Sequence, residues 1–256
     1  MARTAVNSNL SLPVDGIWRR LQHALLPPRC LICAQRSDTA RDLCTACRAD
    51  FQSNDRCCAR CALPLALPAA LCGECLKRER PFDAAFAPYV YGHPLDRLLT
   101  QLKFGRSLAA GRVAAELWID ALRRMLADGV ITALPEVLVP VPLHAQRLRE
   151  RGYNQALELA RPLTHAFGLT FAPDLLARTR ATPAQAELDA KARRKNLRNA
   201  FEFRLSKDQS KPPTSAVLLD DVMTTGATLA ECARTLKRAG VMQVAVWAFA
   251  RAPRLH

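Results

Sequence analysis

The chain has 256 residues, half of them hydrophobic and 23% charged, and its formal net charge is +14. This composition excludes a disordered protein, and the length allows one ordinary domain together with a smaller one. No apolar run approaches the ~20 residues that a membrane span requires, and the start of the chain has no continuous apolar stretch of the signal-peptide kind. We therefore expect a cytoplasmic protein without a membrane span, and its positive charge favours an anionic partner.

Residues 1–26 are expected to form a short lead-in with one or two helical turns around Ile17–Leu26. The next segment, 27–80, holds four CxxC pairs at a constant step, formed by Cys30, Cys33, Cys44, Cys47, Cys58, Cys61, Cys72 and Cys75. Two intervening residues let both sulfurs of a pair face one tetrahedral Zn²⁺, and four sulfurs close a structural site. We predict a double zinc ribbon with two structural zinc ions, which supply most of its folding free energy.

The spacing leaves two metal assignments open. The first four cysteines can share one ion and the last four another, or the pairs can interleave. Redox-active CxxC pairs are a less favoured alternative, because thioredoxin-type motifs come singly within a βαβ unit. The ribbons could serve either as a scaffold that packs on the larger domain or as a nucleic-acid contact surface. Cys57 falls outside the pattern, and Cys232 lies in a predicted helix, where a core role is expected.

In residues 81–256, apolar strands alternate with helices. We predict strands at Ala85–Tyr91, Val137–Val141, Ala216–Asp220 and Met242–Phe249, and helices at Leu108–Leu126, Asn154–Phe167 and Thr228–Ala239. Such alternation is typical of an α/β fold with a doubly wound, mainly parallel sheet. In these sheets, ligands bind at the carboxyl ends of the strands, where loops meet the first turns of helices.

One loop has the chemistry of such a site. The segment Ser215–Leu229 reads SAVLLDDVMTTGATL, an apolar strand followed by two acids, two threonines, Gly226 and the start of a helix. Backbone N–H groups at a helix start bind phosphate, and the threonines add hydroxyl donors. Gly226 permits an unusual φ or a close approach of the backbone to a ligand. Two carboxylates beside a phosphate would normally repel it. Their presence is explained if they bind neutral hydroxyls of the same ligand, such as those of a ribose.

This loop resembles the signature with which type I phosphoribosyltransferases bind 5-phosphoribosyl-1-pyrophosphate (PRPP). The resemblance implies that Asp220 and Asp221 bind the ribose 2- and 3-hydroxyls, and that PRPP binds together with Mg²⁺. It also implies that the 5-phosphate is held by the turn composed of Thr224, Thr225, Gly226, Ala227 and Thr228.

A second segment, Val139–Ala160, runs from a strand into a helix and carries Arg147, Arg149 and Arg151 just before a glycine. Arginines beside a glycine turn suit a pyrophosphate, which requires multidentate donors. We assign Arg147 and Arg151, with Asp220 and Asp221, to the catalytic set. For Arg149, a solvated helix face is an equal alternative. Asn154 can cap the helix that follows.

A third segment, Leu175–Lys211, carries ten Lys/Arg against four Asp/Glu. In type I phosphoribosyltransferases a mobile hood closes over PRPP in the corresponding stretch. Residues that could belong to such a hood are Thr182, Gln185, Arg193, Arg194 and Asn196. A solvated basic helix explains the same composition equally well.

Together, the cysteine pairs, QLKFGR at Gln101–Arg106, the arginine segment, the basic segment and the PRPP loop resemble the competence protein F family. That family is linked to DNA uptake in natural transformation. The resemblance leaves three functions open: a phosphoribosyltransferase with an unknown acceptor, a non-enzymatic protein that binds single-stranded DNA on a basic surface, and an adaptor that contacts competence partners such as a helicase.

Overall fold

A computed structural model describes residues 27–105, 107–180, 199–205 and 210–254. The helical turns expected around Ile17–Leu26 lie outside these ranges. So do the hood candidates Thr182, Gln185, Arg193, Arg194 and Asn196. The chain divides into two compact units, residues 1–48 and 49–256, and each is described by itself.

The two ribbons repeat the same backbone pattern, one in each unit. In the first, the N–H of Cys30 donates to the carbonyl of Gln35, and in the second the N–H of Cys58 donates to that of Leu63. A short helix follows the third cysteine of each, α2 (Thr45–Ala49) and α3 (Gly73–Lys77). The residue after the second cysteine has positive φ in both copies, at Ala34 and Ala62. The repeated unit is thus one ribbon with two CxxC pairs.

The second unit contains a six-stranded sheet in the order β1-β8-β7-β3-β4, with β2 also paired to β8. Its strands are β1 (Ala84–Phe86), β2 (Tyr89–Val90), β3 (Val137–Pro140), β4 (Thr170–Phe171), β7 (Ser215–Met223) and β8 (Gln243–Arg251). All of these pairings are parallel. A separate antiparallel pair is formed by β5 (Leu176–Arg178) and β6 (Phe201–Phe203). The predicted α/β fold with a mainly parallel sheet is confirmed.

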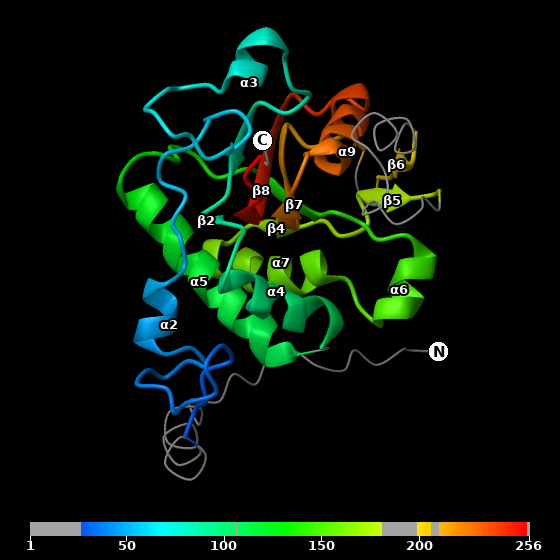
Figure 1. The fold of residues 1–256 in the computed structure, drawn as a ribbon. Helices are drawn as coiled ribbons and strands as arrows, with labels where there is room; N and C mark the ends of the chain where they lie inside the picture. Colours follow the sequence, from blue (N-terminus) through cyan, green and yellow to red (C-terminus); the bar gives the residue numbers. More distant parts are fainter. Residues whose placement is uncertain (1–26, 106, 181–198, 206–209, 255–256) are drawn as a thin grey trace, which may run out of the picture. The chain divides into compact units, whose positions relative to one another are not determined.

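Helices cover both faces of this sheet (Figure 1). They are α4 (Leu95–Phe104), α5 (Leu108–Ala127) and α7 (Gln155–Phe167) on one face and α9 (Ala227–Arg238) on the other. Helix α6 (Ala145–Arg151) has no buried residue and does not cover the sheet. On one face, Leu218 of β7 and Val246 of β8 share a hydrophobic cluster with Cys232 of α9. On the other face, Trp118 of α5 packs on Phe249 of β8, with ring centroids 5.7 Å apart. None of the helices within the described ranges is long and apolar enough to cross a membrane.

The second ribbon is part of the core of this unit. Its four cysteines are buried, and they belong to the hydrophobic cluster that also contains the buried apolar residues of α9. The β5–β6 pair contributes Leu176 and Phe201 to the same cluster. A short metal-binding segment buries little apolar surface of its own, so this packing joins the stability of the ribbon to that of the sheet.

Three features differ from the sequence-based expectation. The single strand predicted at Ala85–Tyr91 is wrong: it is split into β1 and β2 around Pro88, which has no N–H to donate. The strand expected to end at Asp220 continues to Met223, because β8 pairs with it that far. Helices α4 and α6 complete the connections between strands and were not expected as separate elements.

Candidate functional site

The candidate site lies where the strand order reverses. From β3 the chain passes through α6 and α7 to β4 on one side, while β7 on the other side leads through α9 to β8. The connections after β3 and after β7 therefore leave the same edge of the sheet in different directions and open a crevice between them. The pairing of β3 with β7 ends at Pro140 and Leu219, immediately before the two acids.

The two acids point to opposite faces of β7, as successive residues of a strand do. Asp221 faces α4, where its Oδ2 lies 3.1 Å from Nζ of Lys103. Asp220 is on the α9 side, where its charge acts on Cys232 of that helix. The acids are also linked along the backbone, because the N–H of Asp221 donates to Oδ1 of Asp220 at 2.9 Å. Together they present carboxylates on both sides of the strand end.

Asp220 has an unusual protonation equilibrium. Burial raises its pKa to about 7, the negative charge of Asp221 adds to this rise, and the positive charge of Lys103 opposes it. A group with this pKa changes charge near neutral pH, which is common at binding and catalytic sites. A ligand that brings a cation or hydroxyl donors would favour the ionised carboxylate.

The loop after β7 forms a tight turn into α9. Gly226 has φ of 72°, in the left-handed region, and its α-carbon faces Met223, whose methyl group would lie 2.6 Å from an added Cβ. Thr225 Oγ1 accepts a hydrogen bond from the N–H of Ala227 at 3.3 Å. Thr224 is exposed, whereas Thr225, Ala227 and Thr228 are half-buried. The first N–H groups of a helix lack acceptors within it, so this turn can bind a phosphate dianion.

The predicted arginines lie on α6, which follows β3. Arg147 is half-buried, and its positive charge acts on Arg178, on which Asp220 acts in the opposite sense. Arg151 donates to Oε1 of Gln155 at 3.0 Å and lies over the ring of Phe104, 5.6 Å from its centroid. Arg147 and Asp220 thus both act on Arg178, whereas Arg151 contacts α7 and the end of α4.

Two cations near the acids were not assigned to the site from the sequence. Lys103 lies in the QLKFGR segment and contacts Asp221 only through the packing of α4. Arg178 ends β5 and stacks on Phe201, 5.6 Å from the ring centroid, and burial lowers its pKa. Neither has a local sequence signal that would place it at the site.

Arg251, the last residue of β8, reaches behind the loop. Its side chain is buried, and Nε donates to the carbonyl of Cys61 at 3.0 Å. Its NH1 donates to the carbonyl of Met223 at 2.9 Å, and also to those of Thr224 and Ala252. One guanidinium therefore joins a metal-site cysteine to the residues that open the loop.

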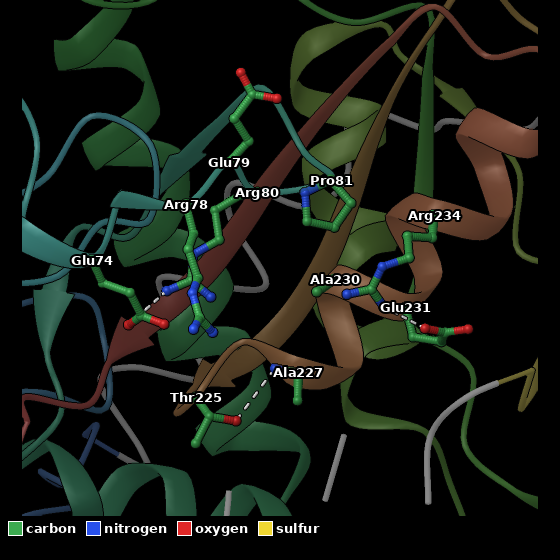
Figure 2. Close-up of a pocket in the computed structure, with 10 residues that line it drawn as sticks. All are labelled: Glu74, Arg78, Glu79, Arg80, Pro81, Thr225, Ala227, Ala230, Glu231 and Arg234. Atoms are coloured by element: carbon green, nitrogen blue, oxygen red, sulfur yellow. Dashed lines mark hydrogen bonds and ion pairs between the residues drawn. The ribbon is translucent and has the colours of Figure 1, made fainter. Parts of the chain in front are cut away.

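A cavity of about 230 Å³ adjoins the loop on the side of the second ribbon. Figure 2 shows Arg78 and Arg80 on one wall and Arg234 on the other, with Thr225 and Ala227 below them. Three carboxylates also line it, and two of them have partners: Glu74 lies 3.0 Å from Arg80, and Glu231 pairs with Arg234. With three guanidinium groups and three carboxylates in its lining, the cavity suits a polar occupant.

The cysteines form two separate clusters. Cys30, Cys33, Cys44 and Cys47 make the first, and Cys58, Cys61, Cys72 and Cys75 the second, with the sulfurs of each cluster within 4.8 Å of one another. A tetrahedron with Zn–S bonds of about 2.3 Å has S···S edges of about 3.8 Å. The distances Cys33–Cys44, 3.9 Å, and Cys61–Cys72, 3.7 Å, match it. Both clusters fit structural zinc, and the sequential assignment is confirmed.

Comparison with known proteins agrees with this arrangement. Residues 21–76 match the double zinc ribbon domain. The chain is 36% identical to competence protein F of Haemophilus influenzae over 225 residues, which cover 88% of this chain and 97% of that one. It is 36% identical to the DNA utilization protein YhgH of Salmonella typhimurium, covering 82% and 90%, and 28% identical to competence protein ComFC of Bacillus subtilis, covering 77% and 79%. With this similarity over nearly its whole length, the chain belongs to the competence protein F family.

Proposed function

We propose that residues 81–256 bind PRPP with Mg²⁺ at the β7–α9 loop and transfer its phosphoribosyl group to an acceptor during the handling of DNA. One observation carries the proposal: two acids and a left-handed glycine immediately precede the start of α9, at the edge where β3 and β7 diverge. Carboxylates suit ribose hydroxyls and the helix start suits a phosphate, so the two halves of the loop match the two halves of a ribose phosphate.

Each side chain has a role that its surroundings support. Asp220 and Asp221 would accept hydrogen bonds from the ribose hydroxyls, and the turn Thr224–Thr228 would hold the 5-phosphate. Arg147 is our candidate for pyrophosphate, because Arg147 and Asp220 both act on the charge of Arg178. Arg151 contacts Gln155 and Phe104, so its proposed role is to position α6. Mg²⁺ bound with PRPP would neutralise part of the pyrophosphate charge.

In the proposed reaction, the bond between ribose C1 and the pyrophosphate oxygen breaks while a bond from the acceptor to C1 forms. The electron pair of the broken bond leaves with pyrophosphate, and the acceptor loses a proton. Positive charge develops at C1 and negative charge on the leaving group, so fixed cations near the pyrophosphate stabilise the transition state. The carboxylates hold the ribose and thereby orient C1 toward the acceptor.

Calorimetry tests the binding step. PRPP with Mg²⁺ should bind the full chain with a stoichiometry of one, and the heat should disappear in Asp220→Asn/Asp221→Asn. Glu202→Gln is a matched control, because that carboxylate is exposed and pairs with Arg204. Absence of binding to the unmodified protein would exclude the proposal. Release of pyrophosphate on addition of nucleobases or DNA then tests transfer.

A second function is favoured by the relatives, whose names refer to competence and DNA utilization. In this alternative the protein binds single-stranded DNA without turnover. The net charge of +14 supports it. Such binding is mainly electrostatic, and its affinity should fall steeply with salt. Gel shifts across a salt series test it: no shift near 50 mM salt would argue strongly against this function.

A further inference from the structure

The contacts of Arg251 join two parts of the chain that are far apart in sequence. Its Nε donates to the carbonyl of Cys61, a member of the second cysteine cluster, at 3.0 Å. Its NH1 donates to the carbonyls of Met223 and Thr224, where β7 turns into the proposed phosphate loop. Because the guanidinium is planar and rigid, movement of one set of acceptors disturbs the hydrogen bonds to the other.

Burial makes these contacts energetically important. The Arg251 residue is 4% exposed, and its hydrogen bonds go to main-chain carbonyl groups. Four thiolates around one Zn²⁺ keep a net negative charge, so the loaded cluster provides a counter-charge for the buried guanidinium.

We propose that Arg251 is a positioning residue for the phosphate loop, and that it couples the loop to the second zinc cluster. Zinc at that cluster fixes the guanidinium, and the guanidinium fixes the carbonyls of Met223 and Thr224. This in turn orders the turn that receives the phosphate. The proposal rests on the proposed function only in taking PRPP as the ligand of this loop.

Coupling of this kind is reciprocal. If zinc in the second cluster strengthens PRPP binding, PRPP must strengthen zinc binding by the same factor. Typical couplings between sites are about five- to 150-fold, and we expect the low end of that range because one side chain carries it. The first cluster lies in the other compact unit, so it provides an internal reference.

Zinc release from the unmodified full chain provides the first test. A chromogenic chelator is added with and without saturating PRPP and Mg²⁺. The absorbance of the zinc–chelator complex then gives the release rates of the two zinc ions. The Cys33→Ser variant removes the first cluster and so identifies the phase that belongs to the second. PRPP should slow release from the second cluster about fivefold and leave the first unchanged. Equal rates with and without bound PRPP would overturn the proposal.

The Arg251→Lys variant provides the second test, because lysine keeps the charge but loses the planar fork. It should bind PRPP about tenfold more weakly, and saturating PRPP should no longer protect the second zinc. Arg254→Lys is the matched control. Arg254 pairs with Glu74 of the same ribbon and does not contact the loop carbonyls, so both properties should stay at the unmodified level. Retained protection in Arg251→Lys would refute the coupling.

Amide hydrogen exchange separates this inference from the proposed function. In zinc-loaded Arg251→Lys, exchange should be faster both at Cys58–Leu63 and at Met223–Leu229, while the strands β3 and β8 up to Phe249 stay protected. This measurement needs no PRPP. Unchanged exchange at the loop would overturn the inference even if PRPP binds. If calorimetry detects no binding of PRPP, the proposed function is overturned. The exchange result would still decide whether Arg251 links the loop to the second cluster.

Discussion

Lys103 of α4 and Asp221 of β7 form an ion pair at the candidate site, with Nζ 3.1 Å from Oδ2. Both side chains are largely buried, at 22% and 11% exposure. The pair places a cation at the end of β7, where the side chains of Asp220 and Asp221 point to opposite faces of the strand. Its ammonium also opposes the rise in the pKa of Asp220, so it influences both carboxylates.

Replacing this lysine should therefore shift the pH dependence of ligand binding. In Lys103→Gln the pKa of Asp220 rises above about 7, because the opposing positive charge is lost. PRPP affinity should then require a higher pH, and at pH 7 it should fall about tenfold. Calorimetric titrations between pH 6 and pH 9 measure this. Lys237→Gln removes a lysine paired with Asp83 at 2.8 Å, away from the acids, and should change nothing. Superimposable pH profiles for Lys103→Gln and the unmodified protein would rule out the assigned role.

Asp220 should also make the stability of the protein depend on pH. Its pKa is about 7 in the folded chain, against a reference value of 3.8. Because the folded state holds this proton more tightly, its contribution to stability is full below about pH 4 and is lost as the pH rises through about 7. The shift corresponds to at most about 4 kcal/mol. Urea unfolding of the ligand-free protein at pH 5 and pH 8 should show a smaller difference in Asp220→Asn. An unaltered difference would contradict the raised pKa.

The sequence predicted those parts of the fold and the site that have local signals. The apolar run of β7, the acids and the glycine before α9 are consecutive residues, so the loop and its flanking elements were recognised. The two ribbons follow in the same way from the cysteine repeat. Sequential metal sharing could not be chosen from spacing alone, because both assignments place the same residues within reach.

What the sequence missed depends on packing between distant segments. Lys103 reaches Asp221 because α4 packs on the α5 side of the sheet, and nothing near Lys103 indicates that contact. Arg251 looks like the polar end of a strand, yet its guanidinium is buried against Cys61 and Met223. Helix α6 has no buried residue and therefore lacks the apolar periodicity that predicts a helix.

Gly226 should be irreplaceable in the loop for steric reasons. In Gly226→Ala, a φ of 72° costs about 1–2 kcal/mol, and the added methyl group meets Met223 at 2.6 Å. We expect a loss of stability of about 2 kcal/mol and at least a tenfold loss of PRPP affinity. Gly168→Ala is the control: its φ is 64° with open space around it, so stability should fall while affinity stays unchanged. Equal affinities in both variants would mean that the turn does not contact the ligand.

The two zinc clusters should differ in their effect on the main domain. The second cluster is buried in the core that includes Cys232 of α9, whereas Cys33 of the first is exposed and belongs to the other unit. Cys61→Ser should lower zinc from two ions per chain to one and lower Tm by about 10 °C or more, since loss of a core metal site costs several kcal/mol. Cys33→Ser should lose the same amount of zinc with little change in the main unfolding transition. Metal analysis and calorimetric scans measure both, and equal shifts in Tm would show that the first ribbon also stabilises the sheet.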